Sequence, residues 1–258
     1  MTTHQIDTLL VEDSGGATGD AVLCIHGLGG SSNFWSPVME AFGDRRVIRP
    51  DLAGAGRSAT PDRLSIAAHV AGLIRVLDVL GIDRVHLVAH SMGTIVAQHL
   101  AVEHPARLRS LALFGPLAAP PEPAREATRN RARQARQGAV AMQEIADAIC
   151  KAATSAETKA DRPVVLALVR EQIMRQPAEG YALNCEALAA AEPARIEDLA
   201  VPVLLVTGDE DGVGTPAGTA ALAARLRDVR PFVLQGCGHW TTYEKPFECR
   251  RLLADFYR

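Results

Sequence analysis

The chain has 258 residues, of which 48% are hydrophobic and 22% charged, a composition typical of one large globular α/β domain. Its 27 basic and 30 acidic residues give a net charge of −3, which argues against nucleic acid or a membrane surface as a partner. The eight histidines and five cysteines form no zinc-binding pattern, so no metal and no cofactor is expected. The cysteines are scattered and odd in number, and no leader-like or membrane-spanning segment is seen, so the sequence predicts a cytoplasmic protein.

Short apolar runs bounded by Gly, Pro or Asp alternate along the chain with segments of helical periodicity. The runs predict strands over residues 20–27, 45–52, 84–90, 110–116, 201–208 and 229–236. The periodic segments predict helices over residues 64–81, 92–105, 216–228 and 244–258. Apolar strands interleaved with helices form a mostly parallel sheet with both faces covered, so the fold class is α/β. Such sheets carry their sites at the carboxyl ends of the strands.

One long segment, residues 117–193, interrupts this alternation because it contains no good strand pattern. It opens with the proline-rich stretch PLAAPPEPAR and continues with helix-forming sequence rich in Ala and Arg. We predict a helical cap over 117–193 that covers the strand ends, and a core formed by 1–116 and 194–258. Arginine is dense over 125–136; a solvated helix face is the simpler interpretation, and a surface that attracts acidic substrates is the alternative.

A serine stands at the junction between a predicted strand and a predicted helix. Ser91 follows VHLVAH and precedes MGTIVAQHL, the strand–turn–helix context of a nucleophile elbow. The residues two positions away, Ala89 and Gly93, are small, as the crowding of strand and helix requires. The pattern predicts Ser91 as a catalytic nucleophile, and a helix-capping serine is the alternative.

A serine nucleophile needs a base and an orienting acid, which in this context follow it in the order acid, then histidine. The loop LQGCGHWTTYEKP holds His239, the only histidine after His104, behind a late apolar strand. The loop VTGDEDGVGTP supplies the acid, which we assign to Asp211, with Asp209 as the alternative.

Backbone donors for an oxyanion are expected from two loops. One donor is the N–H of Met92, directly after the nucleophile. The other is the N–H of Leu28, because the glycines of HGLGG, from Gly27 onward, let the backbone turn its amides inward. The stretch lacks the Lys-Ser/Thr of a phosphate-binding loop and the GxGxxG of a dinucleotide site.

The segments HGLGG, DLAGAGRS, AHSMG, GDEDGVGTP and GCGHW occur in an order that resembles the α/β-hydrolase fold family. The resemblance covers nearly the whole chain and is greatest to 3-oxoadipate enol-lactonases and related esterases. It implies an α/β-hydrolase fold with a helical cap after the sixth strand, a triad of Ser91, Asp211 and His239, and an oxyanion hole from Leu28 and Met92.

The expected function is hydrolysis of a small to medium carboxylic ester or lactone through an acyl-enzyme intermediate. Gly27, Trp35 and Trp240 are expected to contact the substrate, because they flank the oxyanion loop and His239; core packing is the alternative for the tryptophans. An enol-lactonase of aromatic degradation, a C–C bond hydrolase and a non-enzymatic receptor are the alternative functions. A small-molecule substrate is the expected partner, and a homodimer is considered.

Overall fold

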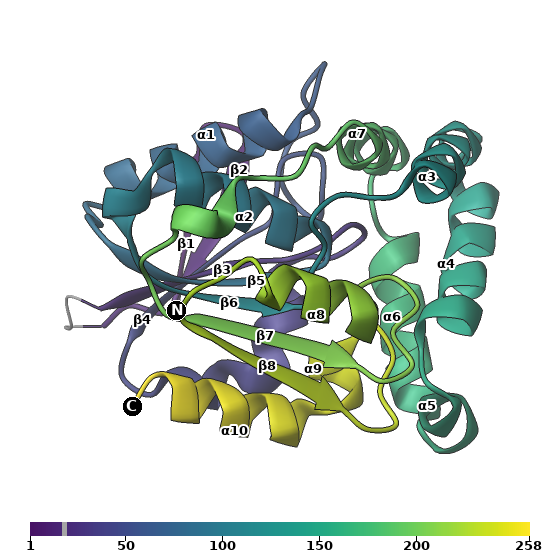
Figure 1. The fold of residues 1–258 in the computed structure, drawn as a ribbon. Coiled ribbons are helices and arrows are strands. Elements are labelled where there is room, and N and C mark those ends of the chain that lie inside the picture. The colour runs from purple at the N-terminus through teal and green to yellow at the C-terminus, as the bar shows by residue number, and fades with distance from the viewer. Residues whose placement is uncertain (17–19) are drawn as a thin grey trace.

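The computed structural model describes residues 1–16 and 20–258 and contains one eight-stranded sheet (Figure 1). The strand order is β1-β2-β4-β3-β5-β6-β7-β8; β1 and β2 pair antiparallel, β2 pairs antiparallel with β4, and the other pairs are parallel. The strands are β1 (Thr2–Ile6), β2 (Leu9–Asp13), β3 (Ala21–Ile25), β4 (Arg46–Pro50), β5 (Val85–His90), β6 (Leu108–Phe114), β7 (Val203–Gly208) and β8 (Val229–Leu234).

Helices cover both faces of this sheet. Helices α1, α2 and α8 pack on one face, and η1, α9 and α10 on the other (Figure 1). The core helices are α1 (Ile66–Val79), α2 (Met92–Glu103), α8 (Pro216–Ala223), α9 (Thr241–Glu244) and α10 (Pro246–Phe256). The 3₁₀ segments are η1 (Ser32–Phe42), η2 (Pro105–Arg107) and η3 (Ile196–Asp198).

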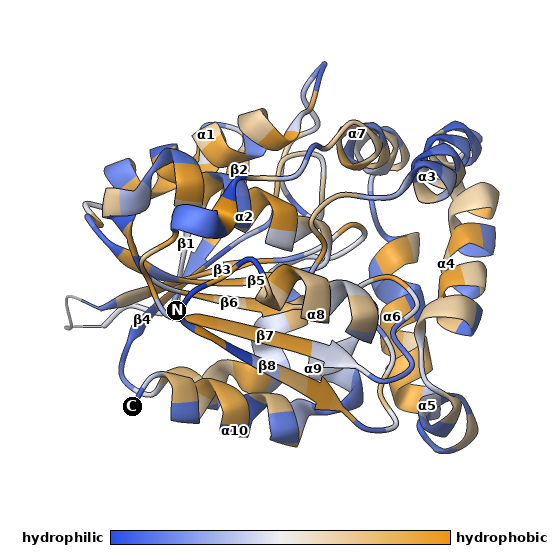
Figure 2. Ribbon diagram, in the orientation of Figure 1, coloured by the Kyte–Doolittle hydropathy of each residue, from blue (hydrophilic) through white to orange (hydrophobic). Residues whose placement is uncertain are grey.

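The central strands are mostly apolar on both sides, which explains why their sequences lack a polar–apolar alternation. In β3, Leu23 and Ile25 pack into the core under α1 and α2, whereas Val22 and Cys24 pack under η1 and α10. All four side chains are fully buried. A sheet buried on both faces therefore accounts for the continuous hydrophobic colouring of the central strands in Figure 2.

Five helices lie between β6 and β7, as predicted for the insert after the sixth strand. They are α3 (Glu122–Ala135), α4 (Ala139–Ala153), α5 (Ala156–Asp161), α6 (Pro163–Met174) and α7 (Ala178–Ala189). In Figure 1 the arrowheads of β7 and β8 point toward this insert, so the helices lie at the carboxyl ends of the strands. We refer to α3–α7 as the cap.

The structure adds two strands that the sequence patterns did not predict. β1 and β2 form an antiparallel hairpin at the sheet edge, and β1 is mostly exposed. An edge strand buries little apolar surface, so its sequence carries little apolar signal. The helix predicted over 216–228 is shorter in the structure and ends at Ala223.

Candidate active site

Ser91 occupies the tight turn between β5 and α2. Its backbone has φ 52° and ψ −124°, a region that residues with a side chain rarely adopt. The turn is crowded, because a Cβ on Gly93 would lie 2.5 Å from the carbonyl oxygen of His26. The Ser91 side chain makes no capping hydrogen bond to α2. The helix-capping interpretation is therefore wrong, and the setting is that of a nucleophile elbow.

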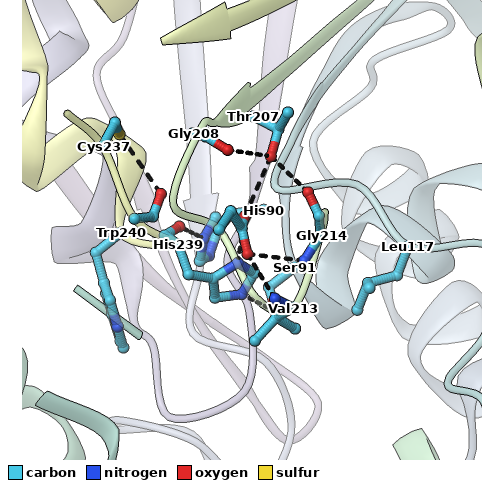
Figure 3. A network of polar contacts seen from close by, with 12 residues as sticks. His90, Ser91, Leu117, Thr207, Gly208, Val213, Gly214, Cys237, His239 and Trp240 are labelled. Atoms are coloured by element: carbon cyan, nitrogen blue, oxygen red, sulfur yellow. Dashed lines mark hydrogen bonds and ion pairs between the residues drawn. The ribbon is translucent and has the colours of Figure 1, made fainter. Parts of the chain in front are cut away.

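The Ser91 hydroxyl contacts a histidine that in turn contacts a carboxylate (Figure 3). Ser91 Oγ lies 2.8 Å from His239 Nε2, and His239 Nδ1 lies 2.8 Å from Asp211 Oδ2. Because an ionised carboxylate only accepts, Nδ1–H donates to Asp211 and leaves Nε2 free to accept from Ser91. All three side chains are buried. The predicted residues thus meet in one hydrogen-bonded chain.

Asp211 is held in its ionised form. Burial opposes ionisation, but the charge and ring N–H of His239 and the backbone amides of Val213 and Gly214 outweigh it and lower the pKa of Asp211 to about 2. Both amides donate to Oδ1 at 2.8 Å. Oδ1 is thereby fixed by the loop, and Oδ2 is presented to the imidazole.

The other acidic residues of this loop have different partners. Asp209 is exposed and accepts from the amide of Cys237 at 3.0 Å. Glu210 accepts from the amide of Ala156 in the cap at 2.8 Å. Of the three candidates, Asp211 is the acid that contacts His239.

The two expected oxyanion donors flank Ser91. Met92 is the first residue of α2, so its amide belongs to the first turn, where N–H groups have no acceptor within the helix. Leu28 lines the same cavity as Ser91, in a loop closed by a hydrogen bond from the Gly30 amide to the Gly27 carbonyl at 3.0 Å. Among the described residues neither N–H has an acceptor.

A cavity of about 780 Å³ opens over Ser91 and His239, between the strand ends and the cap. Its walls are mostly small or aliphatic side chains from the β6–α3 connection, α3, α4 and α7, among them Leu117, Ala124, Ile145, Ile149 and Leu188. The volume falls within the range usual for small-molecule sites.

The three residues expected to contact substrate have different positions. Trp240 lines the cavity. Trp35 does not; it is fully buried in the core and packs edge to face on Phe34 and Phe114, because η1 turns its ring toward the sheet. Gly27 lies against the nucleophile rather than in the lining: a Cβ there would come 2.7 Å from Ser91 Cβ. Core packing, the alternative, therefore holds for Trp35.

His90, which the sequence analysis did not single out, supports the histidine loop from beneath. Its Nε2–H donates to the carbonyl oxygen of His239 at 2.8 Å, and its ring stacks on Phe34 at a centroid distance of 4.1 Å. Burial lowers the pKa of His90 well below its ordinary value, so the ring stays neutral. Its position directly before the predicted nucleophile is the sequence signal that could have identified this residue.

Glu244 is a second residue that sequence reasoning missed. Its fully buried carboxylate accepts from the amides of Gly238 and Trp240, on either side of His239, each at 3.1 Å. It also accepts from the Ser155 amide at 2.8 Å and the Thr158 hydroxyl at 2.9 Å in the cap. One carboxylate thereby ties the histidine loop to the start of α5.

Within residues 1–16 and 20–258, no group of three His, Cys, Asp or Glu side chains is arranged to hold a metal ion. Within them, too, no helix is both long and apolar enough to cross a membrane.

Known proteins share this architecture. The chain resembles a thermophilic esterase from Thermogutta terrifontis, solved with malate bound (26% identity, TM-score 0.92, covering 100% of this chain and 98% of that one). It also resembles the enol-lactonase from Burkholderia xenovorans LB400 (28% identity, TM-score 0.90, 99% of each chain).

A protein of Caulobacter sp. (strain K31) named "Putative carbamate hydrolase RutD" is 39% identical over 116 residues, which span 43% of either chain. The match thus covers less than half of that relative. The model of the α/β hydrolase fold family matches residues 20–246. The chain therefore belongs to the α/β hydrolase fold family.

Proposed function

We propose that this protein is a serine hydrolase that cleaves carboxylic esters or lactones through an acyl-enzyme intermediate. The observation that carries the proposal is the chain of 2.8 Å contacts from Ser91 Oγ through the His239 ring to Asp211, at the floor of a cavity of about 780 Å³. The likeness to an esterase and an enol-lactonase supports the same chemistry.

The reaction follows from this geometry. Ser91 Oγ attacks the carbonyl carbon while His239 Nε2 takes its proton, and Asp211 stabilises the resulting imidazolium. The N–H groups of Leu28 and Met92 bind the oxyanion; loss of one such donor costs about 10²–10³ in kcat. His239 then protonates the leaving oxygen, and water attacks the acyl-enzyme with His239 as base. In a lactone, the leaving oxygen stays attached to the acyl group.

The decisive experiment is an ester and lactone panel on the wild type and on Ser91→Ala. We expect hydrolysis in the wild type and a loss of about 10⁶ in kcat in the variant, as for removal of other triad nucleophiles. A fluorophosphonate should label Ser91 in the wild type, as located by peptide mass spectrometry, and leave the variant unlabelled. Ser65→Ala, which removes an exposed serine that caps α1, is the control that should keep full activity.

The panel also separates the competing functions. A carbamate and an amide with the same acyl group test the class named for the Caulobacter relative, and a diketone tests C–C bond cleavage. Activity of Ser91→Ala within tenfold of wild type would overturn the assignment of the nucleophile. Ligand binding without turnover of any panel member would favour a receptor.

A further inference from the structure

The arginines in the wall of the cavity have no acidic residue beside them in the lining. Arg131 and Arg225 line it, and among the described lining residues there is no aspartate or glutamate. Arg225 is neutralised, because its Nε lies 2.8 Å from Glu197 Oε1. Among the described lining residues, Arg131 therefore carries the positive charge that no carboxylate neutralises.

Arg131 differs from its neighbours in α3. The other four arginines between 125 and 136 make ion pairs at the protein surface: Arg125 with Glu192 at 3.3 Å, Arg129 with Glu122 at 3.2 Å, Arg133 with Glu126 at 3.3 Å and Arg136 with Glu179 at 2.9 Å. In the part of the chain that the structure describes, Arg131 has no carboxylate within ion-pair distance. This helix thus turns its paired charges outward and one half-buried guanidinium toward the cavity.

A second polar group in the same wall lacks a well-formed hydrogen bond. Tyr181 of α7 is 2% exposed, and among residues 1–16 and 20–258 its buried hydroxyl makes no hydrogen bond of good geometry, although Arg131 and Cys185 are its polar neighbours. Burial raises the pKa of Tyr181, while the nearby charge of Arg131 acts in the opposite direction, so the phenol stays protonated and able to donate. Its ring borders the oxyanion loop, since a Cβ on Gly29 would lie 3.2 Å from Tyr181 Cε2.

We propose that Arg131 and Tyr181 bind a free carboxylate of the substrate, so that the preferred substrates are esters or lactones carrying a second, ionised acid group. A guanidinium supplies only donors, a protonated phenol can donate its O–H, and a carboxylate supplies only acceptors. Arginine matches the planar carboxylate with two parallel N–H groups, and the apolar walls strengthen the attraction by excluding water. The inference rests on the proposed hydrolase function for the reacting carbonyl, but the binding site itself does not.

The first test compares substrates that differ only at the far end of the acyl chain. These are the mono-p-nitrophenyl esters of adipate, pimelate and suberate, against the p-nitrophenyl esters of hexanoate, heptanoate and octanoate. For the acid half-esters, Arg131→Gln should lower kcat/KM at least about tenfold and Tyr181→Phe several-fold, with little change for the neutral esters. Arg129→Gln removes an exposed, paired arginine of the same helix and is the matched control.

The second test does not depend on turnover. Binding of pimelate to Ser91→Ala is measured by calorimetry, with and without Arg131→Gln, after circular dichroism has shown that each variant is folded. Arg131-dependent binding supports the site even if no ester is hydrolysed, in which case the proposed function alone fails. Equal effects of Arg131→Gln on acid and neutral esters, or pimelate binding that Arg131→Gln leaves unchanged, would overturn the inference.

Discussion

Replacing Asp211 by asparagine changes the chemistry of the acid with almost no change of shape. The remaining carbonyl oxygen can still accept from the Val213 and Gly214 amides, which donate to Oδ1 at 2.8 Å. The new amide nitrogen then takes the place of Oδ2, 2.8 Å from His239 Nδ1. Because the amide N–H must donate, Nδ1 must accept, and the ring proton moves to Nε2. There it faces Ser91 Oγ, and the imidazole can no longer act as base.

The expected loss is about 10⁴-fold in kcat, the size produced by the wrong histidine tautomer, or about 5 kcal/mol of activation free energy. KM for a p-nitrophenyl ester should change little, because Asp211 lies behind the imidazole and outside the cavity lining. The pKa of about 2, against an ordinary value of 3.8, implies that the ionised carboxylate stabilises the fold by about 2 kcal/mol. The Tm should therefore fall by roughly 4–8 °C.

Initial rates and thermal melts of Asp211→Asn and Asp209→Asn make the comparison. Asp209 is an exposed residue of the same loop and contacts the Cys237 amide, so its variant should keep kcat within about twofold. A kcat for Asp211→Asn within tenfold of wild type, or a larger loss in Asp209→Asn, would refute the reasoning.

Three further outcomes are expected. The lowered pKa of Asp211 stabilises the fold fully above about pH 5, and this contribution is lost as pH falls through 2. Across that range the unfolding free energy in urea should therefore fall by about 2 kcal/mol more in the wild type than in Asp211→Asn. Glu244→Gln keeps one acceptor oxygen, so its new NH2 group faces either the Gly238 amide, at the Oε2 position, or the Trp240 amide, at the Oε1 position. The variant should lower stability by about 3 kcal/mol and kcat more than KM, and an unchanged melt would contradict the role of the buried carboxylate. Ligand binding should quench the fluorescence of Trp240, so a quench that persists in Trp240→Phe would be inconsistent with its position in the cavity wall.

The central strands, the elbow and the order of the site residues could be predicted because each leaves a local trace in the sequence. β5 is a continuous apolar run, Gly93 is needed where a Cβ would meet the His26 carbonyl, and His239 follows a late strand in a glycine-flanked loop. The acid could be narrowed to a loop, but the choice between Asp209 and Asp211 depends on how that loop turns, which its spacing alone does not fix.

What sequence reasoning missed depends on contacts between distant segments. Glu244 contacts Ser155 across 89 residues, and His90 contacts the His239 carbonyl across 149. Trp35 follows the oxyanion loop closely, yet the direction of its ring is set by the packing of η1 on the sheet rather than by its place in the chain. Arginines at neighbouring positions of α3 look alike in the sequence, and only the fold distinguishes Arg131 from those paired at the surface.

The Ser91–His239 hydrogen bond joins points 148 residues apart, and the Asp211–His239 bond joins points 28 apart. Closing such a large loop is slow compared with forming helices from neighbouring residues. The nucleophile's elbow can form locally from β5 and α2, but the base arrives with the last segment of the chain. A partly folded molecule can therefore hold most of its helical signal and an exposed serine while lacking a base to activate it. Recovery of hydrolysis after dilution from denaturant thus requires the C-terminal segment to dock, a step that circular dichroism does not isolate.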